Sequence, residues 1–211
     1  SYWEGIQCDV QLYLKEAIPR GPPEAVYEPM RHLTFAAPTT TASSLCVAAC
    51  ELVGGDRKQA IAAAAALHLM HAALYAHEHL PLTEGHPPSR RPIEHRYGPN
   101  IELLTGDGLI PFGVELVAQS MDPSSNNHDR ILKVIIEITR ATGSQGMVDG
   151  LYRRKNLELH SDSDITELEY VCKKIEGEIH ACGGACGAIL GGAGEEEIER
   201  LRKFGLLVGT I

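Results

Sequence analysis

Apolar residues recur three or four positions apart along most of the chain, which is the spacing of one face of an α-helix. Between Val10 and Ile18 this pattern is regular, and Pro19 ends it. No run of useful length alternates between apolar and polar residues, so we predict an all-α fold without a sheet. The same helical spacing predicts further helices over residues 24–35, 44–53, 100–118, 129–142 and 195–208.

Local capping signals set the bounds of the two most apolar helices. Asp56 follows the pair Gly54-Gly55, which is typical of a helix end, and it predicts the start of an Ala-rich helix that runs to about His79. Asp164, with a glutamate three residues later, predicts the start of a helix that runs to about Leu190. The second half of that helix is rich in Gly and Ala, and such small residues let the backbones of neighbouring helices approach closely.

Two segments interrupt the helical pattern. Residues 81–99 contain five prolines and two glycines, so they cannot form a regular element, and we predict a long mobile loop there. Residues 143–150 are predicted to be flexible or to form a short helical piece. A chain of 211 residues with 44% apolar residues is long enough for one sizeable core, and we assign residues 1–211 to a single-domain helical bundle.

Charge and hydropathy exclude two classes of partner. The formal net charge is −9 and there is no block of Lys and Arg, so we expect no nucleic-acid partner, because phosphate neutralisation needs clustered cations. The most apolar run, residues 60–70, is too short to span a bilayer, and we expect it to be a buried helix rather than a membrane segment. The acidity is typical of a solvated surface.

Six cysteines in a chain of this length do not make a disulfide scaffold, and we infer a reducing compartment. Cys46 and Cys50 are four residues apart, as are Cys182 and Cys186, which places each pair on one helix face about 6 Å apart. Such pairs are often small buried hydrophobes, and two pairs together could form a four-thiolate zinc site. We favour a third interpretation, a seam where helices dock within or between chains. These four cysteines are therefore our candidate partner-binding residues.

Histidines are concentrated between residues 68 and 95. His68 and His71 share a helix face, but a metal site would need a third ligand from elsewhere in the chain. We therefore expect these histidines to lie on the helix surface and in the loop. The basic clusters 90–91 and 153–155 are typical of solvated turns, and the sequence has neither a phosphate-binding glycine loop nor a nucleophile elbow.

The end of the Ala-rich helix resembles a known family. Residues 77–81 read His-Glu-His-Leu-Pro, and Glu84 is the next acid. This segment resembles the first aspartate-rich segment of the trans-prenyl diphosphate synthases, where the helix ends in His-Asp-Asp-Leu-Pro with a further Asp beyond. In that family the carboxylates hold Mg²⁺, which neutralises the diphosphate leaving group. The resemblance makes Glu78, His79 and Glu84 vestigial metal-motif positions.

Further segments resemble the plant geranylgeranyl diphosphate synthases in the same order, so the similarity spans roughly residues 1–211. The positions that hold substrate in that family differ here. Residues 37–43 lack all three cations of a Gly-Gly-Lys-Arg-x-Arg-Pro loop, residues 150–154 replace Gly-Gln-x-x-Asp, and residues 175–176 replace Lys-Thr. Threonine hydroxyls do not replace guanidinium groups as ligands of a diphosphate. The matching segments are residues 45–55, 106–109, 187–192 and 201–204.

Simultaneous loss at several substrate-contacting places is typical of a subunit that no longer catalyses. The pattern resembles the non-catalytic small subunits of plant heteromeric geranyl diphosphate synthases, the mint type in particular. The resemblance implies a degenerate polyprenyl synthase domain of the isoprenoid synthase fold around a large cavity. It implies a plastid location and no catalytic residue, metal or cofactor in this chain.

The same resemblance implies a homologous large catalytic subunit as the partner. That subunit would carry the Mg²⁺, in a heterodimer or heterotetramer, and this chain would shift its product from C20 toward C10 geranyl diphosphate for monoterpene synthesis. The loop 81–99 is a candidate contact with that partner.

Two other functions stay open at this point. In one, the chain is an active Mg²⁺-dependent prenyltransferase that binds the metal through Glu78, His79 and Glu84, although Mg²⁺ prefers hard oxygen ligands and this segment has few. In the other, it is a zinc or redox-thiol protein built on the two cysteine pairs.

Overall fold

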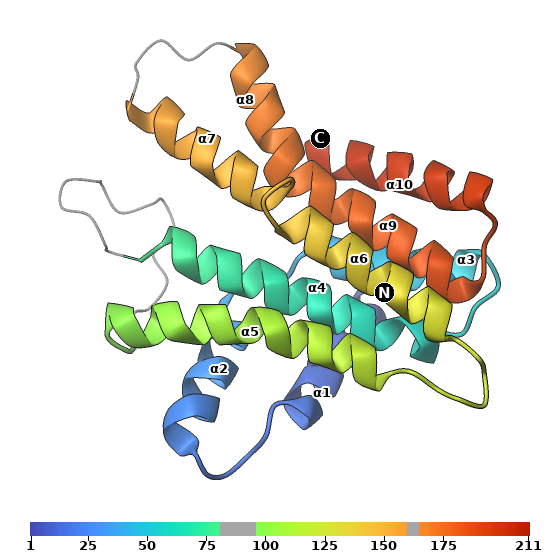
Figure 1. Ribbon diagram of the computed structural model, residues 1–211, viewed down its shortest axis with the longest axis horizontal. Coiled ribbons are helices and arrows are strands. Elements are labelled where there is room, and N and C mark those ends of the chain that lie inside the picture. The colour runs from blue at the N-terminus through green and yellow to red at the C-terminus, as the bar shows by residue number, and fades with distance from the viewer. Residues whose placement is uncertain (81–95, 160–164) are drawn as a thin grey trace.

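A computed structural model describes residues 1–80, 96–159 and 165–211 of the chain. Within these three segments the chain forms helices joined by short connections, and no strand occurs (Figure 1). The all-α fold class predicted from the sequence is confirmed. The helices are, in chain order, α1 (Tyr2–Ala17), α2 (Glu24–Ala36), α3 (Thr41–Leu52), α4 (Arg57–Glu78), α5 (Pro99–Gln119), α6 (His128–Thr142), α7 (Met147–Leu159), α8 (Ile165–Cys172), the π-helical turn η1 (Lys173–Gly177), α9 (Glu178–Gly191) and α10 (Glu195–Thr210).

Two helices form the centre of the bundle. The helix α4 lies alongside α5 and also contacts α3 and α9, whereas α9 is enclosed by α3, α6 and α10 (Figure 1). Both central helices are rich in Ala or Gly, so their neighbours approach closely on several sides. By length and composition α4 could cross a membrane, but 78% of its most apolar window is buried inside the fold, as in the core helix of a globular protein.

The capping signals in the sequence are reproduced by the structure. The Asp56 carboxylate accepts a hydrogen bond from the Lys58 backbone N–H at 2.8 Å, and the Gln59 side chain accepts from the Asp56 N–H at 2.6 Å, which starts α4 where it was predicted. Two other starts lie earlier than predicted. A capping box of Ser1 and Glu4 starts α1 at Tyr2, and the Thr40 hydroxyl caps α3, which starts at Thr41.

Two predicted segments differ from the structure, and others lie outside the residues that it describes. The prediction of a flexible or short helical piece at residues 143–150 understates α7, which continues to Leu159. The predicted helix from residue 165 to about 190 contains the π-helical turn η1, which hydrophobic spacing does not reveal. The predicted loop 81–99 and the helix start at Asp164 fall largely outside the described residues, and α5 begins at Pro99.

Candidate functional site

The predicted metal-motif positions lie at the C-terminal end of α4. Glu78 is the last residue of this helix, and its carboxylate forms an ion pair with the guanidinium of Arg154 on α7. Both side chains are about two-thirds sheltered, with exposed fractions of 27% for Glu78 and 30% for Arg154. His79 follows as the C-cap residue of the helix. Its Nδ1 lies 2.7 Å from the Tyr75 carbonyl oxygen, and the centres of the His79 and Tyr75 rings lie 4.2 Å apart. Glu84 lies outside the described residues.

This donor set does not fit Mg²⁺. The ion requires near-octahedral coordination by oxygen, usually from more than one carboxylate. The Glu78 carboxylate is already bound to a guanidinium, and the neighbouring side chain His79 is an imidazole directed at its own helix. Across the three described segments, no group of three or more His, Cys, Asp or Glu side chains is arranged to hold a metal ion.

The segment that corresponds to the family's basic loop is used for internal contacts. Thr40 caps α3, and the hydroxyl of the next residue, Thr41, lies 2.5 Å from Nε2 of His180 on α9. The other ring nitrogen of His180, Nδ1, lies 2.6 Å from the carbonyl oxygen of Glu176 in η1. Because a carbonyl can only accept, Nδ1 carries the proton in the neutral ring, and Nε2 accepts the hydrogen bond from Thr41.

The space beside this segment is small. A cavity of about 10 Å³ lies among Thr40, Ser43, Ser44 and His68, and a single water molecule requires about that volume. The hydroxyls of Ser43 and Ser44 are buried and find no hydrogen-bond partner among the described residues. This corner therefore encloses room for about one water molecule.

Three histidines near this cavity are sheltered rather than exposed. His68 is 5% exposed, and its Nε2 donates to the Thr34 carbonyl oxygen at 2.8 Å; His180 is also 5% exposed. The Nε2 atom of His71 is buried without a partner, and burial lowers the pKa of His71 to about 4, with further lowering by His68 and His180. Burial also lowers the pKa of His68. The expectation that the α4 histidines lie on the helix surface is therefore wrong for His68, whereas His71 is partly exposed and only its Nε2 atom is buried.

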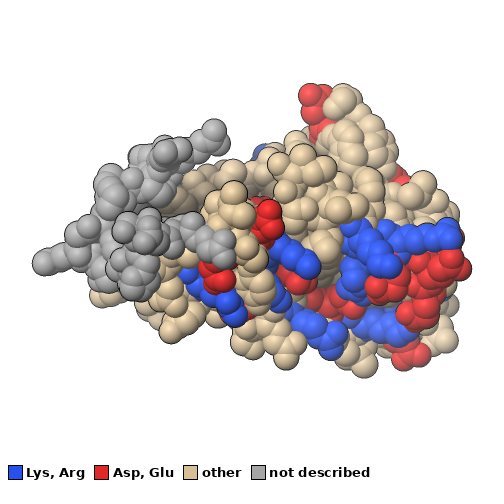
Figure 2. Space-filling view, turned by 90° about the horizontal axis from the view of Figure 1, so that it is seen from above, with Lys and Arg blue, Asp and Glu red and all other residues tan. Residues whose placement is uncertain are grey.

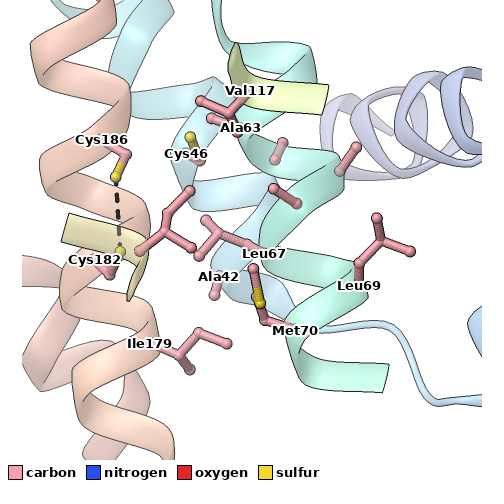
Figure 3. Close-up of a cluster of buried hydrophobic side chains, with 14 of the residues drawn as sticks. Ala42, Cys46, Ala63, Leu67, Leu69, Met70, Val117, Ile179, Cys182 and Cys186 are labelled. Carbon is pink, nitrogen blue, oxygen red and sulfur yellow. Dashed lines mark hydrogen bonds between the residues drawn. The ribbon is translucent and has the colours of Figure 1, made fainter. Parts of the chain in front are cut away.

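Cys46 of α3 lies beside Cys182 and Cys186 of α9 in a seam between these two helices inside this chain (Figure 3). Cys50, one turn further along α3, lies with its carbonyl oxygen against Gly191 of α9. None of the four residues is more than 2% exposed, and the sulfur atoms of Cys182 and Cys186 lie 3.7 Å apart. The seam within the chain is thus observed. A role of these cysteines in partner binding stays a prediction, and it has to act through the positions of the two helices because the side chains are covered.

Burial also determines the chemistry of these thiols. It raises the pKa of Cys46 well above its usual range and that of Cys50 to about 11, while the hydrogen bond with Cys182 and burial raise that of Cys186. Metal binding and thiol–disulfide exchange both need the thiolate. The environment of Cys46, Cys50 and Cys186 therefore opposes the redox interpretation, and in the described segments no three potential metal ligands are arranged to hold zinc.

Glycines on α9 allow the seam to close. A Cβ atom on Gly183 would overlap the carbonyl oxygen of Ala42, and one on Gly187 would overlap that of Cys46. The backbones of α3 and α9 are therefore in direct contact. The sequence prediction that small residues on this helix serve close helix packing is borne out.

The basic cluster at residues 153–155 lies on α7 rather than in a solvated turn. The Arg153 guanidinium lies 3.2 Å from Asp149 and 3.1 Å from Glu167, and it stacks 4.3 Å from the ring centre of Tyr170. Arg154 instead reaches α4. Sequence reasoning missed this pairing, although a signal existed: an arginine stands where the family has the Asp of Gly-Gln-x-x-Asp, and it faces a helix end where the family has further acids.

Charged side chains gather on part of the surface, and there both signs are interspersed (Figure 2). On the face drawn in Figure 2, Lys and Arg side chains lie beside Asp and Glu rather than as a block of one sign. One such group joins α10 to α6, where Arg202 holds both carboxylate oxygens of Glu137 at 2.6 and 2.9 Å. This bidentate geometry pairs the charges locally.

Comparison with known proteins places the chain in a family. No protein-family model matches it. The chain is 52% identical over 216 residues to the heterodimeric geranylgeranyl pyrophosphate synthase small subunit 2 of Cannabis sativa, covering 100% of this chain and 75% of that protein. It is 31% identical over 207 residues to large subunit 1 of such a synthase from Arabidopsis thaliana, covering 96% of this chain and 56% of that protein. Both relatives carry the designation chloroplastic.

Two solved structures are also similar. The geranyl diphosphate synthase small subunit of Antirrhinum majus superposes with a TM-score of 0.92 at 63% identity, covering 99% of this chain and 80% of the other. A chain in the structure of a deletion mutant of the heterotetrameric geranyl pyrophosphate synthase of mint superposes with a TM-score of 0.90 at 59% identity, with the same two coverages of 99% and 80%.

The fold is that of the isoprenoid synthases. The chain belongs to the trans-prenyl diphosphate synthase family, in the branch of small subunits of plant heteromeric geranyl and geranylgeranyl diphosphate synthases. The resemblance stated from the sequence is thereby confirmed, as is the plastid location, which the chloroplastic relatives share.

Proposed function

We propose that this chain is a regulatory, non-catalytic subunit that binds a homologous large catalytic subunit and shifts its product from C20 toward C10 geranyl diphosphate. The observation that carries the proposal is the contact between Thr41 and His180 at 2.5 Å. It commits the segment that would cradle a diphosphate to holding α3 against α9.

The chemistry of diphosphate binding supports this reading. A diphosphate needs charge-assisted donors such as guanidinium groups, and residues 37–43 contain neither Lys nor Arg. The cavity beside Thr40 holds about 10 Å³, about the volume of one water molecule, and the described residues that line it include no cation. Residues 37–43 correspond to the loop that holds isopentenyl diphosphate, and the end of α4 corresponds to the carboxylates whose Mg²⁺ neutralises the departing diphosphate of the allylic substrate. Because both sets of groups are replaced here, the chemistry would take place in the partner, which also supplies the Mg²⁺.

The partner itself is proposed from kinship. The relatives include large and small subunits of one kind of synthase, and a large subunit shares 31% identity with this chain. A non-catalytic chain can alter a partner's product only by binding one conformation of that partner more tightly than another. A heterodimer and a pair of heterodimers both satisfy this condition. The loop 81–99 is our candidate for the contact that selects this conformation. It lies largely outside the described residues.

The test is an assay of products with and without this chain. The full-length protein is assayed alone and after copurification with a geranylgeranyl-synthase-type large subunit, using dimethylallyl and isopentenyl diphosphates and Mg²⁺. We expect no turnover alone and an increased C10:C20 ratio in the complex. Substantial Mg²⁺-dependent turnover by the lone chain would support the alternative of an active enzyme. A complex that turns over faster than the large subunit but still makes the C20 product would contradict only the product shift.

A further inference from the structure

We propose that the guanidinium of Arg154 takes the place of a metal ion at the C-terminal end of α4, so that a built-in cation stabilises this end of the fold and no Mg²⁺ is needed there. The groups around Glu78 do not meet the coordination requirements of Mg²⁺, because the one described carboxylate there is paired with a guanidinium.

The C-terminal end of α4 is a position that favours a cation. The last carbonyl groups of a helix carry partial negative charge, and α4 is 22 residues long. Glu78 adds a full negative charge at the same end, where its side chain is only 27% exposed. Two sources of negative potential therefore coincide in a partly sheltered place, where an uncompensated charge is unfavourable.

The helix α7 brings the compensating charge to this place. Gly150 and Arg154 are four residues apart on α7 and share one face. A Cβ atom at Gly150 would lie 2.8 Å from side-chain atoms of both Lys174 and Ile175, so α7 lies tightly against the start of η1 at this point. One turn further along, the Arg154 side chain spans the remaining gap to Glu78.

The other basic residues of the cluster do not share this role. Arg153 is held by Asp149 and Glu167 within the α7–α8 pair. Lys155 is exposed to solvent. A guanidinium also remains charged over the whole physiological pH range and is attached to the chain, so the cation is present at any Mg²⁺ concentration.

The test compares thermal unfolding of the full-length protein in EDTA and in excess MgCl₂. We expect the wild-type Tm to be the same in both. Arg154→Asp should lower the Tm in EDTA, because two carboxylates then face each other, and Mg²⁺ should restore part of the loss by bridging them. Lys155→Asp makes the same change of charge one residue away on an exposed position, and its Tm should not respond to Mg²⁺.

Two further measurements keep the inference testable even if Arg154→Asp does not fold. Calorimetric titration of the wild type with MgCl₂ should show no Mg²⁺ binding at Glu78. Mg²⁺ binding that is present in the wild type and abolished in Glu78→Gln would overturn the proposal. The charge-swapped variant Glu78→Arg/Arg154→Glu should regain most of the Tm lost by Arg154→Asp and remain insensitive to Mg²⁺. No recovery in the swapped protein would also overturn it. The readout is the folding of this chain, so a negative result leaves the proposed regulatory role standing.

Discussion

Thr41 and His180 are 139 positions apart in the sequence, yet the hydroxyl of the first and Nε2 of the second lie 2.5 Å apart. The hydrogen bond joins the first turn of α3 to α9, and the opposite ring nitrogen is bound to the Glu176 carbonyl group. A residue in the segment that holds substrate in the family here makes a hydrogen bond to a buried histidine. Its contribution should be measurable as folding stability.

We expect Thr41→Val to lower the free energy of unfolding by about 1 kcal/mol, because Nε2 of the buried His180 loses a hydrogen-bond donor while side-chain volume is conserved. The matched control is Thr139→Val on α6, where the exposed threonine hydroxyl bonds only to its own helix at 2.8 Å. Urea denaturation of both variants checks the prediction. Equal costs for the two substitutions would contradict it.

A second prediction concerns acid stability. His71 has a folded-state pKa of about 4, below the value near 6.5 of an unfolded chain, so protonation favours unfolding. Its effect is absent above about pH 7 and grows as the pH falls from 6.5 to 4, to a total on the order of 3 kcal/mol. His71→Gln cannot take up this proton, so its stability should decline less steeply over that interval. His128→Gln, on the exposed first residue of α6, is the control for the substitution itself, and equal slopes for the two variants would contradict the prediction.

A third prediction uses glycine at the α3–α9 seam. Gly187→Ala places a methyl group against the Cys46 carbonyl oxygen and 2.8 Å from the Ala49 methyl group, so the helices must separate. We expect a loss of about 1–3 kcal/mol from overpacking. Gly108→Ala on α5 meets open space and should be neutral or stabilising by up to about 1 kcal/mol. A stable Gly187→Ala protein would mean that the two helices are not in backbone contact.

A fourth prediction separates the interpretations of the cysteines. Cys8 and Cys172 are exposed and the other four are buried, so a thiol reagent should modify two cysteines quickly in the native chain and the rest only on unfolding. Elemental analysis of the same sample should find no stoichiometric zinc. Rapid modification of all six thiols, or one zinc per chain, would restore the redox or zinc interpretation.

A fifth prediction concerns association with the large subunit. Cys46→Ser with Cys50→Ser places hydroxyls in an apolar seam at a cost of about 1–3 kcal/mol for each one left unpaired. We expect a lower Tm of this chain, with weaker capture of the partner following from it. Cys8→Ser should change neither quantity. Weaker capture without any loss of Tm would indicate that these cysteines contact the partner directly.

Local interactions explain what the sequence alone determined about this protein. Helical periodicity, the capping pattern at Asp56 and the small residues of α9 depend on neighbours within a few positions, so they predicted the all-α class and most helix bounds. The similarity to prenyl synthases also lay in the sequence, because it follows contiguous segments. The departures at residues 37–43 and 150–154 indicated which contacts with substrate had changed, though not what had replaced them.

The directions of the altered side chains follow from the packing of the helices and not from the sequence pattern. The helices α3, α4 and α9 are apolar on nearly every side, so spacing does not mark an inner face, and it could not show that Cys46 and Cys182 meet within the chain. The partners of Arg154 and Thr41 come from distant helices, and ion pairs and side-chain hydrogen bonds of this kind carry no periodic signal. They form because the packing of Ala- and Gly-rich helices brings these side chains within reach of each other.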